Sequence, residues 1–185
     1  MYSQTLITAP GQPAPCIVLI GMAGAGKSTV GKEIARRIDW AYMDTDHLLE
    51  AAYGAPLKFV ANSFDKKTFI QAEGEMICSI RASRVVIATG GSVVYHDIAM
   101  RHLADLGVLV YLDVPFPVVE RRIAAKSDRG LAIAPGQSLL DLFSERYPLY
   151  KTWAALCCDV GQKNPAQCAK WILEHLPPKF FGPRQ

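Results

Sequence analysis

Short, unbroken apolar runs alternate along the chain with longer stretches in which apolar residues recur every three or four positions. Unbroken runs of this length are typical of strands that are buried on both faces of a parallel sheet. We therefore predict five strands. They lie at Cys16–Ile20, Trp40–Met43, Arg84–Thr89, Gly107–Leu112 and near Cys158–Val160.

The stretches between these runs have the spacing of helices. We predict helices at Ser28–Ile38, in two or three pieces over His47–Ala82, at Asp97–Ala104, from Pro115 in the first turn to Ala125, at Ser138–Ala155 and at Pro165–His175. Strands that alternate with helices favour an α/β fold, with a parallel sheet covered on both faces. A polar segment with Gly and Pro, residues 126–137, is predicted to be a mobile loop.

The length of 185 residues suits one domain. We expect a loose leader at 1–15, a domain at 16–176 and a loose C-terminal tail at 177–185. Five cysteines are present without metal-binding spacing, which is typical of buried thiols in a reducing compartment.

Charge and hydropathy exclude several classes of partner. The net charge of +3 is too small to indicate a nucleic-acid partner. No apolar run approaches the roughly 18 residues that a membrane span needs. The first fifteen residues lack the basic-then-apolar order of a secretory signal, so we expect a cytoplasmic protein.

The strongest motif is Gly21-Met-Ala-Gly-Ala-Gly-Lys-Ser28, which matches G-x4-G-K-[ST] between a predicted strand and a predicted helix. Its glycines let backbone N–H groups face one anion, and the start of the helix adds positive potential. The lysine can reach the terminal phosphates of a nucleotide, and the serine hydroxyl can bind Mg²⁺. We therefore expect ATP to contact Gly21, Gly24, Ala25, Gly26, Lys27, Ser28 and Thr29.

Two carboxylates, Asp44 and Asp46, follow the second predicted strand. With strand geometry they would point the same way, and they could then divide metal binding and acceptance of a hydroxyl proton between them. The alternative is that Asp46 or Thr45 caps the next helix. No guanine-recognition segment of the Asn/Thr-Lys-x-Asp type is present, which argues against a GTPase.

Further candidates follow the later elements. Gly90-Gly91 after a buried strand would let the backbone approach a ligand closely, or it is a plain turn. Arg129 in the polar loop could close over the phosphates, or it is a solvated arginine. Arg146 in Ser-Glu-Arg-Tyr-Pro-Leu-Tyr has the same two interpretations, a ligand contact or a helix-surface residue.

In their order and spacing from about Cys16 to His175, these motifs resemble a shikimate kinase. The resemblance implies a single P-loop kinase domain with a five-stranded parallel sheet, a mobile lid and MgATP as co-substrate. It implies catalytic roles for Lys27, Asp46 and Arg129, with Mg²⁺ at Ser28 and Asp44. It places adenine at Arg122 and Pro165. It places the acceptor, the molecule that receives the phosphoryl group, at Asp46, Ile70, Glu73, Gly90, Gly91, Ser92 and Arg146.

The chain departs from the family pattern at the acceptor site. The family's F-R-x-x-E segment has an arginine after Phe, which helps to hold the substrate carboxylate, but this chain has Ile70. The family's third glycine is Ser92, and Gly130 follows Arg129 where proline is usual. Losing one charge-assisted bond to a carboxylate costs about 1.5–3 kcal/mol.

These departures leave the acceptor open. We expect a monomeric kinase for shikimate, with homoserine or another small hydroxylated acid as the alternative. A non-catalytic ATP-binding module is the second alternative.

Overall fold

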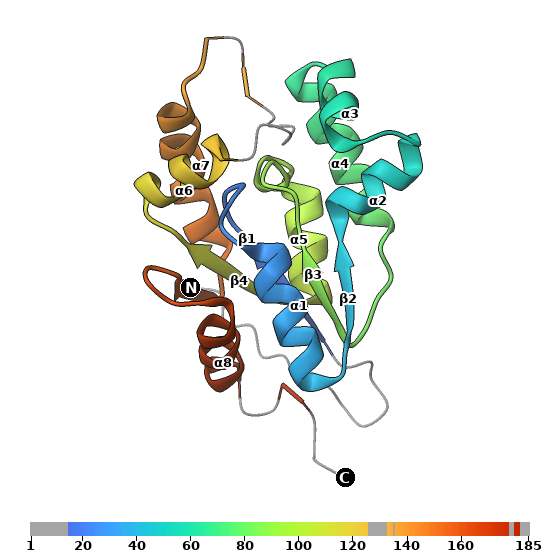
Figure 1. The fold of residues 1–185 in the computed structure, drawn as a ribbon. Helices are drawn as coiled ribbons and strands as arrows, with labels where there is room; N and C mark the ends of the chain where they lie inside the picture. The colour runs from blue at the N-terminus through green and yellow to red at the C-terminus, as the bar shows by residue number, and fades with distance from the viewer. Residues whose placement is uncertain (1–14, 126–132, 135, 178–179, 182–185) are drawn as a thin grey trace.

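The computed structural model describes residues 15–125, 133–134, 136–177 and 180–181. In this part of the chain five parallel strands form one sheet, in the order β2-β3-β1-β4-β5 (Figure 1). Each strand lies within two residues of its predicted position, and the predicted α/β fold is confirmed. The strands are β1 (Cys16–Ile20), β2 (Ala41–Asp44), β3 (Val85–Ala88), β4 (Gly107–Asp113) and β5 (Leu156–Asp159).

The central strand β1 pairs with β3 on one side and β4 on the other. Ile17 stands in register with Val86 of β3 and with Val108 of β4. The strand order reverses direction at β1, so a crevice forms beyond its carboxyl end. The segment that begins at Gly21 enters this crevice.

Helices cover both faces of the sheet. On one face α1 packs against α8, while α4 and α5 pack together behind the strands (Figure 1). Helices α2 and α3 lie beyond the carboxyl end of β2 (Figure 1). The helices are α1 (Lys27–Ile38), α2 (Thr45–Tyr53), α3 (Leu57–Ser63), α4 (Lys66–Ser79), α5 (Asp97–Leu106), α6 (Phe116–Ala124), α7 (Leu139–Trp153) and α8 (Pro165–His175), with a short 3₁₀ helix η1 (Val93–Tyr95).

The core sits on both faces of β1, whose five residues are fully buried. Burial on both faces explains why the strand has no alternating pattern. Among the described helices none is long and apolar enough to cross a bilayer.

Two details differ from the sequence-based predictions. Pro115 is the N-cap of α6 rather than a residue of its first turn, where Pro117 lies instead. The tail was expected to be loose, but Phe180 is buried and its ring lies 5.9 Å from that of Trp40. A large aromatic side chain gains enough from burial to hold the chain there.

Most of the predicted mobile loop, including Arg129, lies outside the described residues.

Candidate active site

The segment between β1 and α1 forms a tight loop that depends on its glycines. Gly21, Gly24 and Gly26 all have positive φ, and Gly26 is the N-cap of α1 without a side-chain cap. Residues with a Cβ rarely adopt these angles. The first N–H groups of α1 therefore point into the loop and are available to an anion.

The side chain of Lys27 folds across this loop. Its ammonium donates hydrogen bonds to the carbonyls of Gly21 at 2.7 Å and Met22 at 2.9 Å, and only 8% of the residue is exposed. The lysine thus places a positive charge on the inner side of the loop, where phosphates would lie.

Ser28 and Asp44 come together as predicted for a metal site. The Ser28 hydroxyl donates to Asp44 Oδ2 at 2.8 Å, and the Tyr42 hydroxyl donates to the same oxygen at 2.8 Å. One hydroxyl and one carboxylate form an all-oxygen donor set, which suits Mg²⁺ held mainly by phosphates and water. The residues present therefore fit the expected metal.

The geometry of the two aspartates differs from the prediction. Asp44 ends β2, whereas Asp46 lies in the first turn of α2. Asp44 Oδ1 accepts from the Asp46 N–H at 3.2 Å, so Asp44 caps the helix, not Asp46 or Thr45. Because the helix begins directly after Asp44, the chain leaves the strand there. The alternation of side chains along a strand therefore does not decide where Asp46 points. Thr45 has another partner: its Oγ1 accepts from the Gly90 N–H at 3.0 Å.

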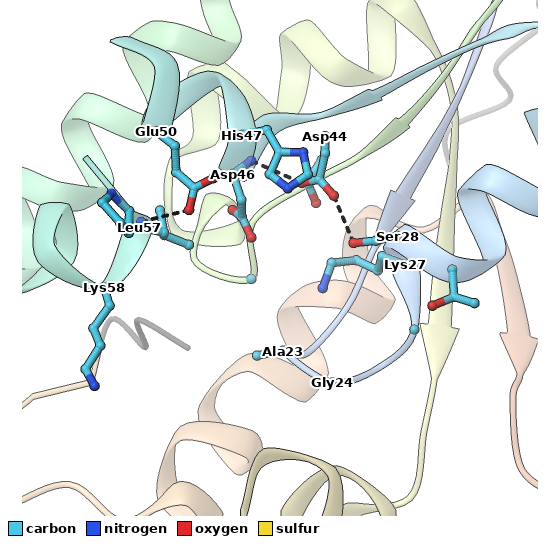
Figure 2. A pocket seen from close by; sticks show the side chains of 15 residues that line it. Ala23, Gly24, Lys27, Ser28, Asp44, Asp46, His47, Glu50, Leu57 and Lys58 are labelled. Carbon is cyan, nitrogen blue, oxygen red and sulfur yellow. Dashed lines mark hydrogen bonds between the residues drawn. The ribbon is translucent and has the colours of Figure 1, made fainter. Parts of the chain in front are cut away.

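Both aspartates nevertheless line one cleft of about 260 Å³ beside the phosphate loop (Figure 2). Figure 2 shows the ammonium of Lys27 and the carboxylate of Asp46 directed into the same space. Other lining residues belong to no motif that the sequence analysis identified. They come from α2, α3 and the loop that joins these helices. These are His47, Glu50, Pro56, Leu57 and Lys58.

Gly90 lies between two residues that line this cleft, Thr89 and Gly91, and it is packed against two carboxylates. A Cβ at Gly90 would collide with Glu73 Oε1 and would lie 2.8 Å from Asp46 Oδ1. Glycine is therefore required here by the close approach of two side chains of the protein itself, while an approach to a ligand stays a prediction. Glu73 and Asp46 consequently meet from two different helices.

Glu73 is buried, with only 1% of the residue exposed. Its Oε2 accepts a 2.6 Å hydrogen bond from the Ser92 hydroxyl, while Oε1 has no partner in the part of the chain that the structure describes. Burial, together with the nearby charge of Asp46, raises the pKa of Glu73 to about 7, although the Ser92 bond opposes the shift. Glu73 can therefore exchange a proton near neutral pH.

Arg146 is also 1% exposed, which excludes the helix-surface interpretation. Its Nε donates to the Tyr95 hydroxyl at 3.2 Å. On its other side, Nη1 would lie 3.1 Å from a Cβ at Gly91, whose carbonyl accepts from the Tyr150 hydroxyl. A buried guanidinium thus lies next to Gly91, which lines the cleft.

Ile70 is not brought into this cleft. The residue is half-buried and lines another hollow, together with Lys66, Tyr95 and Glu145. Ser92 is turned toward Glu73 and does not line the cleft either.

The residues expected around adenine gather at a third place. Arg122 Nη1 donates to the Gly24 carbonyl at 3.0 Å and lines a hollow of about 320 Å³ with Pro165. Gly24, Ala25, Gly26 and Thr29 line the same hollow, and Lys163 and Cys168 do so without having been predicted.

The comparisons with known proteins agree with this geometry. Residues 23–177 match the shikimate kinase family model. The chain belongs to the shikimate kinase family. Shikimate kinase from Aromatoleum aromaticum is 35% identical over 159 residues, which are 84% of this chain and 91% of that protein. The structure of shikimate kinase from Acinetobacter baumannii in complex with shikimate has a TM-score of 0.74 and 29% identity, and covers 87% of this chain and 92% of that one.

A second kind of relative is longer. Human threonine synthase-like 1 is 34% identical over 164 residues, but the match spans 86% of this chain and only 22% of that protein.

Membership of the shikimate kinase family confirms the predicted resemblance and the predicted enzyme class. The chain is a kinase that phosphorylates a hydroxyl group.

Proposed function

We propose that this shikimate kinase family member transfers a phosphoryl group from MgATP to a hydroxyl of a small hydroxylated carboxylic acid, with shikimate as the first acceptor to test. The observation that carries the proposal is the placement of buried Arg146 next to Gly91, which lines the same cleft as Asp46 and Lys27. A buried guanidinium suits a carboxylate.

In the proposed mechanism the acceptor hydroxyl lies against Asp46, which orients it and takes its proton. The acceptor oxygen forms a bond to the γ-phosphorus of ATP, and the bond from that phosphorus to the β–γ bridging oxygen breaks, so ADP leaves. Lys27 and the N–H groups of the phosphate loop offset the negative charge on the phosphoryl oxygens. The proposed lid residue Arg129 would add to this effect.

Ser28 and Asp44 are the residues that would hold Mg²⁺, which supplies charge neutralisation at the phosphates when bound. Tyr42 donates to the same Asp44 oxygen and fixes its orientation. Arg122 and Pro165 would form the walls of the adenine site.

A zwitterionic hydroxy amino acid such as homoserine is the second candidate acceptor. The observation in its favour is the buried Glu73 Oε1, which has no partner among the described residues and lies beside Asp46. An ammonium group would satisfy this oxygen, and the chain lacks the cation that the family has at position 70. Arg146 would still bind the carboxylate.

The test is ADP release from purified protein with MgATP, with shikimate and L-homoserine compared in parallel and a reaction without acceptor as the baseline. Turnover of shikimate, with shikimate phosphate identified as product, supports the first candidate. Turnover of homoserine alone supports the second. No stimulation by either acid, nor by a wider panel of hydroxy acids, contradicts the proposal.

A further inference from the structure

The hollow that Ile70 lines has a volume of about 430 Å³. It is also lined by Lys66, a cationic side chain that no family motif predicts. Lys66 begins α4, one helical turn before Ile70. Its Nζ lies 4.8 Å from the centre of the Tyr95 ring, and the Arg146 Cζ lies 5.1 Å from the same centre. One aromatic ring therefore brings together two cations from α4 and α7.

Tyr95 also fixes how Arg146 lies, because its hydroxyl accepts the Nε hydrogen bond of that arginine. The bond directs the rest of the guanidinium toward Gly91, which lines the acceptor cleft. Arg146 thus lies between Tyr95 and Gly91, which lines the acceptor cleft.

A carboxylate already occupies this corner. Glu145 Oε1 lies 3.7 Å from Lys66 Nζ. Partial burial raises the pKa of Glu145, but hydrogen bonds from Gln137 and Tyr95 and the charges of Lys66 and Arg146 outweigh it, so the pKa lies below its ordinary value. The corner therefore favours an ionised carboxylate.

We propose that Lys66 is the second cation of the acceptor's carboxylate site and serves where the family pattern has an arginine at position 70. A carboxylate held by Arg146 would also contact Lys66, which would exchange its contact with Glu145 for one with the ligand. This inference rests on the proposed function, since it requires an acceptor that carries a carboxylate.

The expected effect is moderate, because a quarter of the Lys66 side chain is exposed and solvent screens its charge. We expect Lys66→Ala to raise the KM for the acid acceptor about fivefold, more than the KM for ATP. Lys66→Arg should keep the wild-type KM. Adding Ile70→Arg to Lys66→Ala should restore it, because an arginine then returns at the family's position. Glu145→Gln should lower the KM, since a competing charge is removed.

Two further lysine variants are compared with Lys66→Ala, one as a control for the loss of a positive charge and one as a test of a rival residue. Lys170→Ala removes an exposed cation that pairs with Glu174 on α8 and lines neither the acceptor cleft nor the hollow at Ile70, so the KM for the acid should stay unchanged. Lys58→Ala removes a cation that lines the cleft itself. An increase in KM in Lys58→Ala but not in Lys66→Ala would overturn the inference and assign the role to Lys58.

Circular dichroism confirms that each variant is folded, and calorimetric titration with the acid measures binding apart from turnover. If wild-type protein turns over an acid and Lys66→Ala has an unchanged KM and Kd, the inference is wrong and the proposed function stands. If wild-type protein neither binds nor phosphorylates any acid of the panel, both fail together.

Discussion

The Ser92 hydroxyl donates a 2.6 Å hydrogen bond to Glu73 Oε2, and both side chains are almost fully buried. The bond joins the loop after β3 to α4 across 19 positions of sequence. It satisfies only one oxygen of the carboxyl group, because Oε1 has no partner among the described residues. Glu73 is consequently easier to protonate than an exposed glutamate.

This environment predicts a pH dependence of stability. The pKa of Glu73 is raised from its ordinary value of 4.5 to about 7 in the folded protein, so folding favours the protonated form. The stabilisation relative to the charged form is complete below pH 4.5 and is lost as the pH rises through 7. The loss amounts to about 3 kcal/mol of unfolding free energy.

Urea unfolding of wild-type and Glu73→Gln protein between pH 4.5 and 8.5 measures this effect as the difference between the two proteins. Glu75→Gln, on the exposed face of the same helix, is the matched control and should show no such trend. A difference between wild type and Glu73→Gln that stays constant across this range would contradict the prediction.

Asp46 is predicted to carry the proton transfer. Asp46→Asn keeps the shape of the side chain but cannot accept the proton, so kcat should fall about 10²- to 10⁴-fold. ATP binding should change much less. ADP release with the best acceptor measures kcat, and Asp105→Asn on the exposed side of α5 serves as control. Nearly full activity in Asp46→Asn would exclude the role.

Asp44 offers a way to separate metal binding from folding. Asparagine caps helices as well as aspartate does, so Asp44→Asn should retain α2 and the stability of the protein. It removes the charge beside Ser28, and the Mg²⁺ concentration for half-maximal activity should rise about tenfold or more. Chelation of Mg²⁺ should abolish ADP release from the wild type.

A magnesium titration of Asp44→Asn, in parallel with Asp97→Asn at the exposed start of α5, measures this change. Equal magnesium requirements in the two variants would argue against a metal at Ser28 and Asp44.

The three central strands β3, β1 and β4 could be predicted because each is a run of apolar residues that is buried on both faces. The residue at which β2 ends could not be predicted in the same way. Asp44 continues the strand by spacing, but its side chain accepts from the Asp46 N–H and starts a helix there. Local capping competes with strand extension, and a single sequence does not show which prevails.

The phosphate loop could be predicted because its residues are contiguous and have fixed tasks. The acceptor site could not be built in this way. Arg146 meets Tyr95 across 51 positions, and Glu73 meets Ser92 across 19. Whether an arginine on a helix is buried depends on such partners. The resemblance supplied the position of Ile70 but not the lysine one turn before it.

The last prediction concerns the anchoring of the C-terminal segment. Phe180 is 1% exposed and packs on Trp40, while Phe181 contacts the same indole edge-on and is 44% exposed. Phe180→Ala would leave a cavity beside the indole and should lower the free energy of unfolding by about 3 kcal/mol or more. Phe181→Ala should cost no more than about 1 kcal/mol.

Urea unfolding followed by tryptophan fluorescence compares the two variants, because Trp40 reports on the packing directly. The contacts lie at the start of β2, away from the acceptor cleft, so kcat and KM should stay at wild-type values in both. Equal and small losses of stability would show that Phe180 does not anchor the segment. A loss of activity in Phe180→Ala at a temperature where it remains folded would mean that this end of the chain acts on the site.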